Sequence, residues 1–274
     1  MQSIRPPAVA GMFYPDNPAE LSTMLRGFLA EAQPAPLRPK ALIVPHAGYI
    51  YSGPIAASAY ALLQPLRASI KRVVLLGPVH RVWTPGLALP GVDAFETPLG
   101  RVVLDQEAIA SIDGLRQVQV HPAAHAQEHS LEVHLPFLQS VLDDFTLVPL
   151  AVGGAGPNEV AEVLEVLWGG AETLIVVSSD LSHFLPYYEA QQVDRATVHE
   201  ILGFNGHLVG EQACGCHPIN GLLLAAQKHG LTPHLLDLRN SGDTAGDRNR
   251  VVGYAALAFT EASTGASMEN NHVQ

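Results

Sequence analysis

Three aliphatic segments of this sequence are each followed closely by a histidine. His46 comes after "ALIV", His80 comes after "RVVLLGPV", and His183 comes after "TLIVVSSDLS", with Asp180 three residues before it. Imidazole is the commonest metal-ligating side chain, and it also gains and loses protons near neutral pH. These residue types therefore indicate a metal site or acid–base chemistry, provided that the chain brings them together.

A metal site of this kind needs a further donor, and the sequence offers several. Two histidines and one anionic ligand, with open coordination positions, let iron(II) bind both an organic substrate and dioxygen. Carboxylates are available at Asp180, Glu128 and Glu132, and Cys214 offers sulfur. Cys214 shortly precedes the expected helix 218–230, and a helix N-terminus favours a thiolate, which is a soft metal ligand. The residues alone leave the choice among these donors open.

The stretch "EHSLEVHLPFL", residues 128–138, adds a fourth histidine of interest. It lacks the HExxH spacing, which places two histidines one turn apart around a general-base glutamate. His129 and Glu132 are three residues apart and would share one face of a helix. We expect His129 at the start of that helix, facing the pocket, and Glu132 as a capping or hydrogen-bonding partner.

The aliphatic runs are typical of buried strands in a parallel sheet, because they are continuous rather than alternating. Helical patterns lie between them, so we expect one α/β domain over residues 1–262, with a mostly parallel central sheet and helices on both faces. The polar residues 263–274 are expected to form a flexible tail. The expected strands cover residues 41–44, 72–77, 145–153, 173–179 and 250–259.

This architecture gives the histidines a common location. Ligands of open α/β sheets bind outside the carboxyl ends of the strands. If the strands are parallel, those ends meet at one edge of the sheet. We therefore expect His46, His80 and His183 to converge on one pocket.

Composition excludes several classes of partner. The net charge is −11 and there is no dense Lys/Arg cluster, so we expect neither a nucleic-acid partner nor an anionic membrane. No apolar run approaches the roughly 20 residues of a membrane helix, and no signal peptide is recognisable. Two cysteines separated by one residue do not form a disulfide framework. These features are typical of a reduced, cytoplasmic protein.

An ordered series of short motifs resembles the Memo family over about residues 5–260. That family includes bacterial proteins of the AmmeMemoRadiSam system protein B type, often encoded beside an AMMECR1-type protein and a radical-SAM protein, which are the partners that the resemblance implies. It also implies a fold similar to that of class III extradiol dioxygenases, which open catechol rings with non-haem iron. The motifs are "AGMFYP", "PHAGYIYSG", "LGPVH", "EHSLEVHLPFL", "VVSSDLSH", "CGCHPI" and "VVGYAA".

The resemblance also implies a set of metal ligands. His46 and His80 match the two histidine ligands of the family, and Cys214 matches its third ligand. The ring-cleaving enzymes have a carboxylate where Cys214 stands, and a thiolate suits copper as well as iron. The metal that we expect is therefore iron(II) first, then copper, then zinc.

The resemblance implies catalytic roles as well. His183 matches the acid/base histidine of the dioxygenases, Asp180 lies beside it, and His129 matches another histidine of the pocket. One hypothesis is a dioxygenase-like oxidoreductase that acts on a small molecule of unknown identity. The alternative is a redox-metal or ligand-binding regulatory module that acts with partner proteins and has no turnover.

Overall fold

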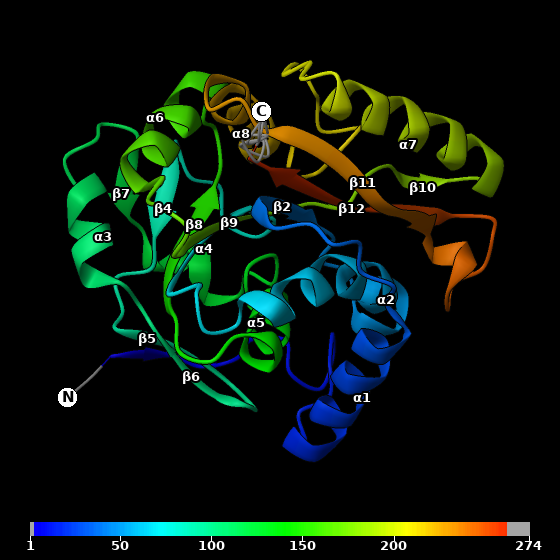
Figure 1. Cartoon of the computed structure of the whole chain (residues 1–274), viewed down its shortest axis with the longest axis horizontal. Coiled ribbons are helices and arrows are strands. Elements are labelled where there is room, and N and C mark those ends of the chain that lie inside the picture. Colours follow the sequence, from blue (N-terminus) through cyan, green and yellow to red (C-terminus); the bar gives the residue numbers. More distant parts are fainter. Residues whose placement is uncertain (1–2, 262–274) are drawn as a thin grey trace, which may run out of the picture.

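A computed structural model describes residues 3–261 of the chain (Figure 1), so the tail expected at 263–274 lies outside the described residues. The strands of the main sheet are β2 (Pro39–Val44), β3 (Arg72–Pro78), β4 (Leu87–Leu89), β7 (Val118–Val120), β8 (Thr146–Val152), β9 (Thr173–Ser178), β10 (His183–Leu185), β11 (Thr232–Asn240) and β12 (Val251–Thr260). Within the described residues they form one sheet in the order β10-β12-β2-β9-β3-β8-β4-β7, with β11 also paired to β12.

The centre of this sheet is parallel and its margins are mixed. Strands β2, β9, β3 and β8 run parallel, whereas β12 and β4 pair antiparallel to this central group. All five expected strands are present, and the predicted fold class is confirmed. The short strands β4, β7 and β10 and the polar strand β11 were not expected, because none of them has a continuous aliphatic run of four or more residues.

A small second sheet lies at one side of the main sheet. It contains β1 (Ile4–Arg5), β5 (Ala94–Thr97) and β6 (Gly100–Val103), in the order β1-β5-β6. Strand β1 pairs parallel to β5, although some 90 residues separate them. The second sheet therefore ties the N-terminus of the described chain to its middle.

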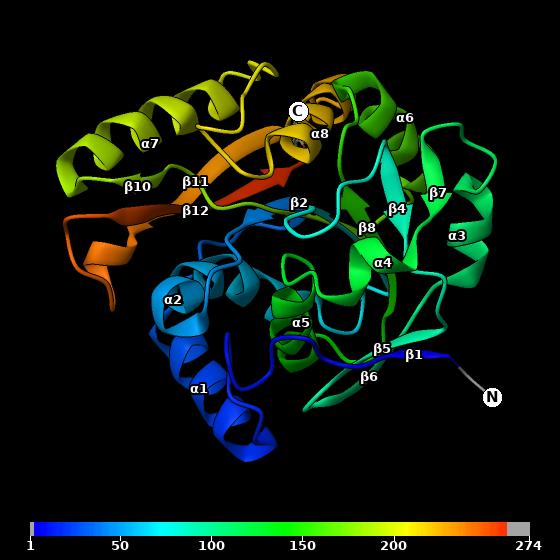
Figure 2. The same cartoon turned by 180° about the vertical axis from the view of Figure 1, so that it is seen from behind.

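Helices cover both faces of the main sheet, as expected (Figures 1 and 2). Alternate residues of β2 show this: Leu42 and Val44 belong to the hydrophobic cluster that includes residues of α1, α2 and α5, while Ala41 and Ile43 belong to the cluster that includes residues of α3, α6 and α8. The helices are α1 (Pro18–Glu31), α2 (Tyr49–Tyr60), α3 (Gln106–Ile112), α4 (Pro122–Ala126), α5 (Leu135–Val141), α6 (Pro157–Leu167), α7 (Tyr187–Leu202) and α8 (Cys216–Lys228); short 3-10 turns span Ala61–Leu66, Glu132–His134 and Ser241–Asp243.

The segment 128–138 differs from the expected helix. Residues 128–131 form a turn, a 3-10 turn follows at Glu132–His134, and α5 begins only at Leu135. The carboxylate of Glu128 accepts hydrogen bonds from the backbone N–H groups of His129 and Ser130, both at 3.0 Å, and this holds the turn. The expectation that His129 lies at the start of a helix is therefore wrong.

None of the helices described in residues 3–261 combines the length and the apolar character that a membrane crossing requires.

Candidate metal centre

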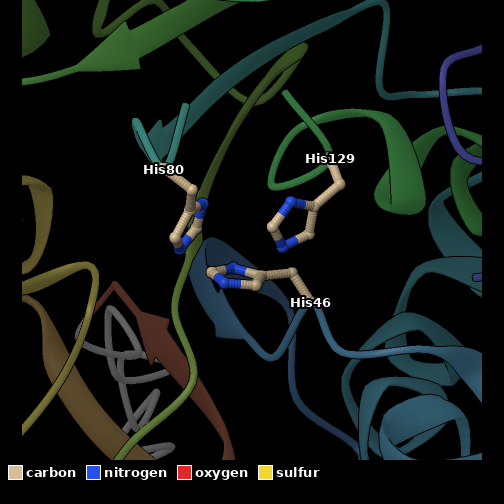
Figure 3. Close-up of side chains that lie close together, drawn as sticks. All are labelled: His46, His80 and His129. Atoms are coloured by element: carbon tan, nitrogen blue, oxygen red, sulfur yellow. The ribbon is translucent and has the colours of Figure 1, made fainter. Parts of the chain in front are cut away.

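Three histidine side chains meet beside the ends of two central strands (Figure 3). His46 follows β2 and His80 follows β3, while His129 comes from the turn after α4. One ligand atom from each ring lies within 4.8 Å of the other two. The ring centroids are 4.6 to 5.3 Å apart. The predicted convergence of His46 and His80 is therefore observed, whereas His183, which we expected to join them, is not in this group; His129 is the third member.

The tautomer of His46 follows from its hydrogen bonds. Its Nδ1 atom lies 2.6 Å from the hydroxyl of Ser178, at the end of β9. That hydroxyl donates its only proton to the carbonyl oxygen of Ser130, at 2.6 Å. Because a carbonyl only accepts, Nδ1 of His46 must be the donor to Ser178. The lone pair of His46 is therefore on Nε2, where it is available to a metal ion.

The carboxylate of Glu128 orients His80. Its oxygens accept hydrogen bonds from Nδ1 of His80 at 2.8 Å and from the backbone N–H of His80 at 2.6 Å. Burial alone would raise the pKa of Glu128, but the hydrogen bonds from His80 and from the backbone of Ser130 outweigh it and lower the pKa to about 2. The ionised carboxylate accepts the Nδ1 proton, which leaves Nε2 of His80 free. Carboxylate–imidazole pairs of this kind fix the ring of a metal ligand.

Burial keeps two of these imidazoles neutral. It lowers the pKa of His46 well below its usual range, and the neighbouring ring of His80 lowers it further. Burial and His80 likewise lower the pKa of His129 to about 4. Neutral imidazole is the form that binds metal ions. His46 and His129 therefore have the protonation that a metal site requires, and all three rings have the necessary proximity.

Cys214 lies beside this group rather than within it. Its Sγ is 3.4 Å from Nε2 of His46, and the backbone N–H of Asp180 donates to Sγ at 3.3 Å. Two ligands of one tetrahedral ion, bonded at about 2.0 Å and 2.3 Å, lie roughly 3.5 Å apart, so this pair has the spacing of co-ligands. The ion would have to lie on the His46 side of the histidine group for Cys214 to reach it.

The protonation of Cys214 differs from the expectation of a thiolate. Helix α8 begins at Cys216 with Gly215 as its N-cap, so Cys214 precedes the helix. Burial, together with the charge of Asp180, raises the pKa of the thiol to about 12. The cost of burying a charge exceeds the stabilisation offered by the helix terminus. Without a bound metal, Cys214 is therefore a neutral thiol.

Asp180 contacts His46 from the β9–β10 connection, and His183, at the start of β10, is near enough for its charge to lower the pKa of His46. One carboxylate oxygen of Asp180 accepts the backbone N–H of His46 at 2.8 Å, and the other is 3.9 Å from Nε2 of His46. Burial raises the pKa of Asp180 to about 7. His183 is half-buried at the start of β10, and burial lowers its pKa. Both side chains are therefore placed to hold or move protons near the site.

Glu132 is a hydrogen-bonding partner, as its position in the motif suggested, and is not part of the histidine group. Its Oε2 atom pairs with Nη1 of Arg5 at 2.7 Å, and Arg5 lies in β1, far from Glu132 along the chain. Sequence reasoning did not identify Arg5, Ser178 or Ser130. Ser178 and Ser130 lie within the quoted motifs "VVSSDLSH" and "EHSLEVHLPFL", but the roles of all three residues depend on contacts between segments far apart in the chain.

Comparison with known proteins agrees with this arrangement of motifs. A family model described as Memo-like protein matches residues 5–258. This chain is a member of the Memo family. The resemblance noted in the sequence is thus confirmed over nearly the whole chain.

Several archaeal members of the Memo family are similar along their whole length. A MEMO1 family protein of Sulfolobus acidocaldarius is 35% identical, and the match covers 93% of this chain and 99% of that protein. Relatives from Methanopyrus kandleri and Ignicoccus hospitalis are 35% and 36% identical, each over 93% of this chain and 98% of the relative. Among solved structures, an uncharacterized protein from Escherichia coli K12 aligns with a TM-score of 0.47 and 13% identity, over 81% of this chain and 100% of that chain.

Proposed function

We propose that this Memo-family protein binds one transition-metal ion on His46, His80 and His129 and uses it to oxidise a small molecule. The observation that carries the proposal is the placement of three imidazoles around one point. In two of them a hydrogen bond from Nδ1 leaves the Nε2 lone pair free. Cys214 is an additional donor on the His46 side. Iron(II) is the first candidate, and copper and zinc follow.

In the proposed site the metal ion would bind the reactants, and side chains of the protein would move protons. Iron(II) held by a few protein ligands with open positions binds an organic substrate and dioxygen together. His183, neutral at pH 7 because burial lowers its pKa, is suited to accept a proton from a substrate hydroxyl. Asp180, with a pKa of about 7, holds the backbone of His46 and can exchange a proton near neutral pH.

Metal content tests the binding part of the proposal. We expect the protein, loaded with iron(II) under anaerobic conditions and desalted, to retain about one equivalent of metal. His46→Ala should lose it, while His199→Ala, which removes an exposed imidazole on α7, should keep it. Bound metal should also raise the midpoint of thermal unfolding by mass action. Equal metal content in all three proteins would contradict the proposed site.

Oxygen consumption tests the catalytic part. The iron-loaded protein is mixed with a panel of catechols, and oxygen uptake is compared with that of the same concentration of free iron(II). We expect uptake above the free-iron rate for at least one compound, and loss of that excess in His183→Ala with metal content retained. If metal binds but no compound is turned over faster than with free iron, the oxidoreductase proposal fails and metal binding stands.

The thiol beside His46 favours a second candidate function, a copper(I)-binding regulatory module without turnover. A soft sulfur donor next to an imidazole suits copper(I), and such a module would act through the AMMECR1-type and radical-SAM partners implied by the family resemblance. Tight copper(I) binding that both His46→Ala and Cys214→Ala abolish, together with no oxygen uptake, would support this candidate. Copper binding that is independent of Cys214 would exclude it.

A further inference from the structure

The N-terminal segment of the described chain crosses the loop that carries His129. We call residues 5–14 the N-terminal strap and residues 125–134 the histidine loop. In Figure 2 the dark-blue chain runs from β1 past α5 toward α1. The strap begins in β1, which pairs with β5, and its last residue, Tyr14, is buried. The strap is therefore anchored at both ends.

The guanidinium of Arg5 makes three contacts with the histidine loop. Its Nε donates to the carbonyl oxygen of His125, its Nη2 to the carbonyl oxygen of Glu128, and its Nη1 to Oε2 of Glu132, each at 2.7 Å. The side chain of Arg5 is only 6% exposed. The guanidinium is planar and its donors have fixed directions. Because it binds two backbone carbonyls and one carboxylate of the histidine loop, it restrains the backbone between those residues.

Glu132 completes the connection in the opposite direction. Its carboxylate, which is fully buried, accepts hydrogen bonds from the backbone N–H groups of Ala8 at 2.7 Å and Val9 at 3.0 Å. It also accepts the hydroxyl proton of Tyr14 at 2.6 Å. The loop thus holds the strap through Glu132, and the strap holds the loop through Arg5.

His129 depends on this connection more than the other two histidines do. Nδ1 of His46 and Nδ1 of His80 each have a short hydrogen bond. Nδ1 of His129 is 3.4 Å from Oε1 of Glu128, which is longer than a normal hydrogen bond. The close partner of the His129 ring outside the histidine group is instead Phe13 of the strap, with ring centroids 4.7 Å apart.

We propose that Arg5 is a positioning residue of the metal site: its contacts with the histidine loop, together with the Phe13 ring, hold His129 toward His46 and His80. This inference rests on the proposed function, because it assigns Arg5 a role in metal binding. It goes beyond that function because part of the affinity for the metal ion would then depend on a residue more than 120 positions away from His129 along the chain. Partners that orient metal ligands typically contribute about 10–100-fold to metal affinity.

The test uses the full chain and cobalt(II) as a spectroscopic probe. Arg5→Lys keeps the charge opposite Glu132 but loses the fork that serves both carbonyls, and Arg5→Met removes the charge as well. The matched control is Arg72→Lys, because Arg72 pairs with Asp105 at 2.7 Å from the opposite end of β3. Cobalt affinity and the visible absorption of the bound ion are measured, with circular dichroism showing that each variant is folded at the chosen temperature.

We expect Arg5→Lys to bind cobalt about 10-fold or more weakly than the wild type, with an altered visible spectrum, and Arg72→Lys to remain within about twofold. A folded Arg5→Met should be weaker still. If Arg5→Lys binds cobalt with wild-type affinity and spectrum, the inference is wrong while the metal site stands. An equal loss of affinity in Arg72→Lys would also overturn it, because the effect would then be one of general stability.

A measurement on the metal-free protein separates this inference from the proposed function. Amide hydrogen exchange of peptides covering residues 125–134 reports the order of the histidine loop without any ion. We expect faster exchange there in Arg5→Lys than in the wild type or Arg72→Lys. Unchanged exchange would overturn the positioning role, even if the wild type bound metal. If the wild type binds no cobalt, the proposed function falls, and with it the metal-binding consequence assigned to Arg5.

Discussion

At the scale of single residues, the candidate site depends on where protons reside. Ser178 and Glu128 each accept a hydrogen bond from Nδ1 of one histidine, which leaves the lone pair of the neutral ring on Nε2. Burial keeps the rings of His46 and His129 neutral. The same burial keeps Cys214 protonated, so this sulfur must lose a proton before it can bind a metal.

Ser178→Ala should weaken metal binding, although it removes none of the proposed ligands. The variant removes the acceptor of the His46 Nδ1 proton, so the ring can rotate or change tautomer. We expect about 10–100-fold weaker affinity for iron(II), measured by competition with a chelator. Ser140→Ala, whose hydroxyl donates to Pro136 within α5, is the control and should bind as the wild type does. Equal affinity of Ser178→Ala and the wild type would contradict the role assigned to Ser178.

Glu128→Gln should destabilise the fold. Glu128 accepts N–H groups on both oxygens, and an amide offers only one acceptor, so one N–H would face an NH₂ group. We expect the free energy of unfolding in urea to fall by about 1–3 kcal/mol. Glu96→Gln, at an exposed pair with Arg101, should change it by less than about 0.5 kcal/mol. Similar values for the two variants would argue against a specific role for Glu128.

At the scale of elements, close helix packing supports the strands that carry the site. Helices α6 and α8 cover one face of the sheet, and α8 follows Cys214 directly. They approach closely at Gly221, where a Cβ atom would lie 2.3 Å from Cβ of Val160. A glycine in the middle of a helix is unfavourable by itself, so its presence here is explained by the contact.

Gly221→Ala and Gly27→Ala should therefore have opposite effects. Both residues lie within helices, but a Cβ at Gly27 in α1 would meet no atom within 4 Å. We expect Gly27→Ala to stabilise the protein by about 0.5–1 kcal/mol, since alanine is the better helix former. Gly221→Ala should destabilise it by about 1–3 kcal/mol, because overpacking forces the helices apart. Thermal unfolding of both variants measures this; stabilisation by both would show that α6 and α8 separate without cost.

At the scale of the whole molecule, buried polar groups join separate helices and strands. Asp194 in α7 accepts the backbone N–H of Ser182 at 3.0 Å, which connects α7 to the segment that follows Asp180. Gly253 of β12 approaches so closely that any side chain there would collide with the carboxyl of Asp194. Burial raises the pKa of Asp194 to about 6.

The raised pKa of Asp194 predicts a specific dependence of stability on pH. A carboxyl that binds its proton more tightly in the folded state contributes stability fully below its unfolded pKa, near 3.8, and loses that contribution as pH rises through about 6. Asp194→Asn removes the titration. The stability of this variant relative to the wild type should therefore rise by about 2–3 kcal/mol between pH 4 and pH 7. Urea unfolding at several pH values checks this; a constant difference would show that Asp194 has an ordinary pKa.

The sequence by itself determined the framework of this protein. Continuous aliphatic runs predicted the central parallel strands, because such runs are stable only when both faces are covered. Helix α1 is an example of local specification: the side chain of Asn17 caps it, and Leu21, Leu25 and Leu29 recur at helical spacing on its buried face. The positions of His46 and His80 after strands expected to be parallel predicted their convergence, and the structure places β2 and β3 on either side of β9.

Only the tertiary structure decided how the site is held. Three features of the site join segments that are separated by tens of residues or more. They are the approach of His129 to His46 and His80, the Ser178–Ser130 hydrogen bond that sets the tautomer of His46, and the Arg5–Glu132 ion pair. The neutral thiol of Cys214 follows from its burial rather than from its place near a helix. The local sequence pattern determines which residues form helices and strands. Which groups become hydrogen-bond partners, and how much it costs to bury a charge, depend on which distant segments pack together.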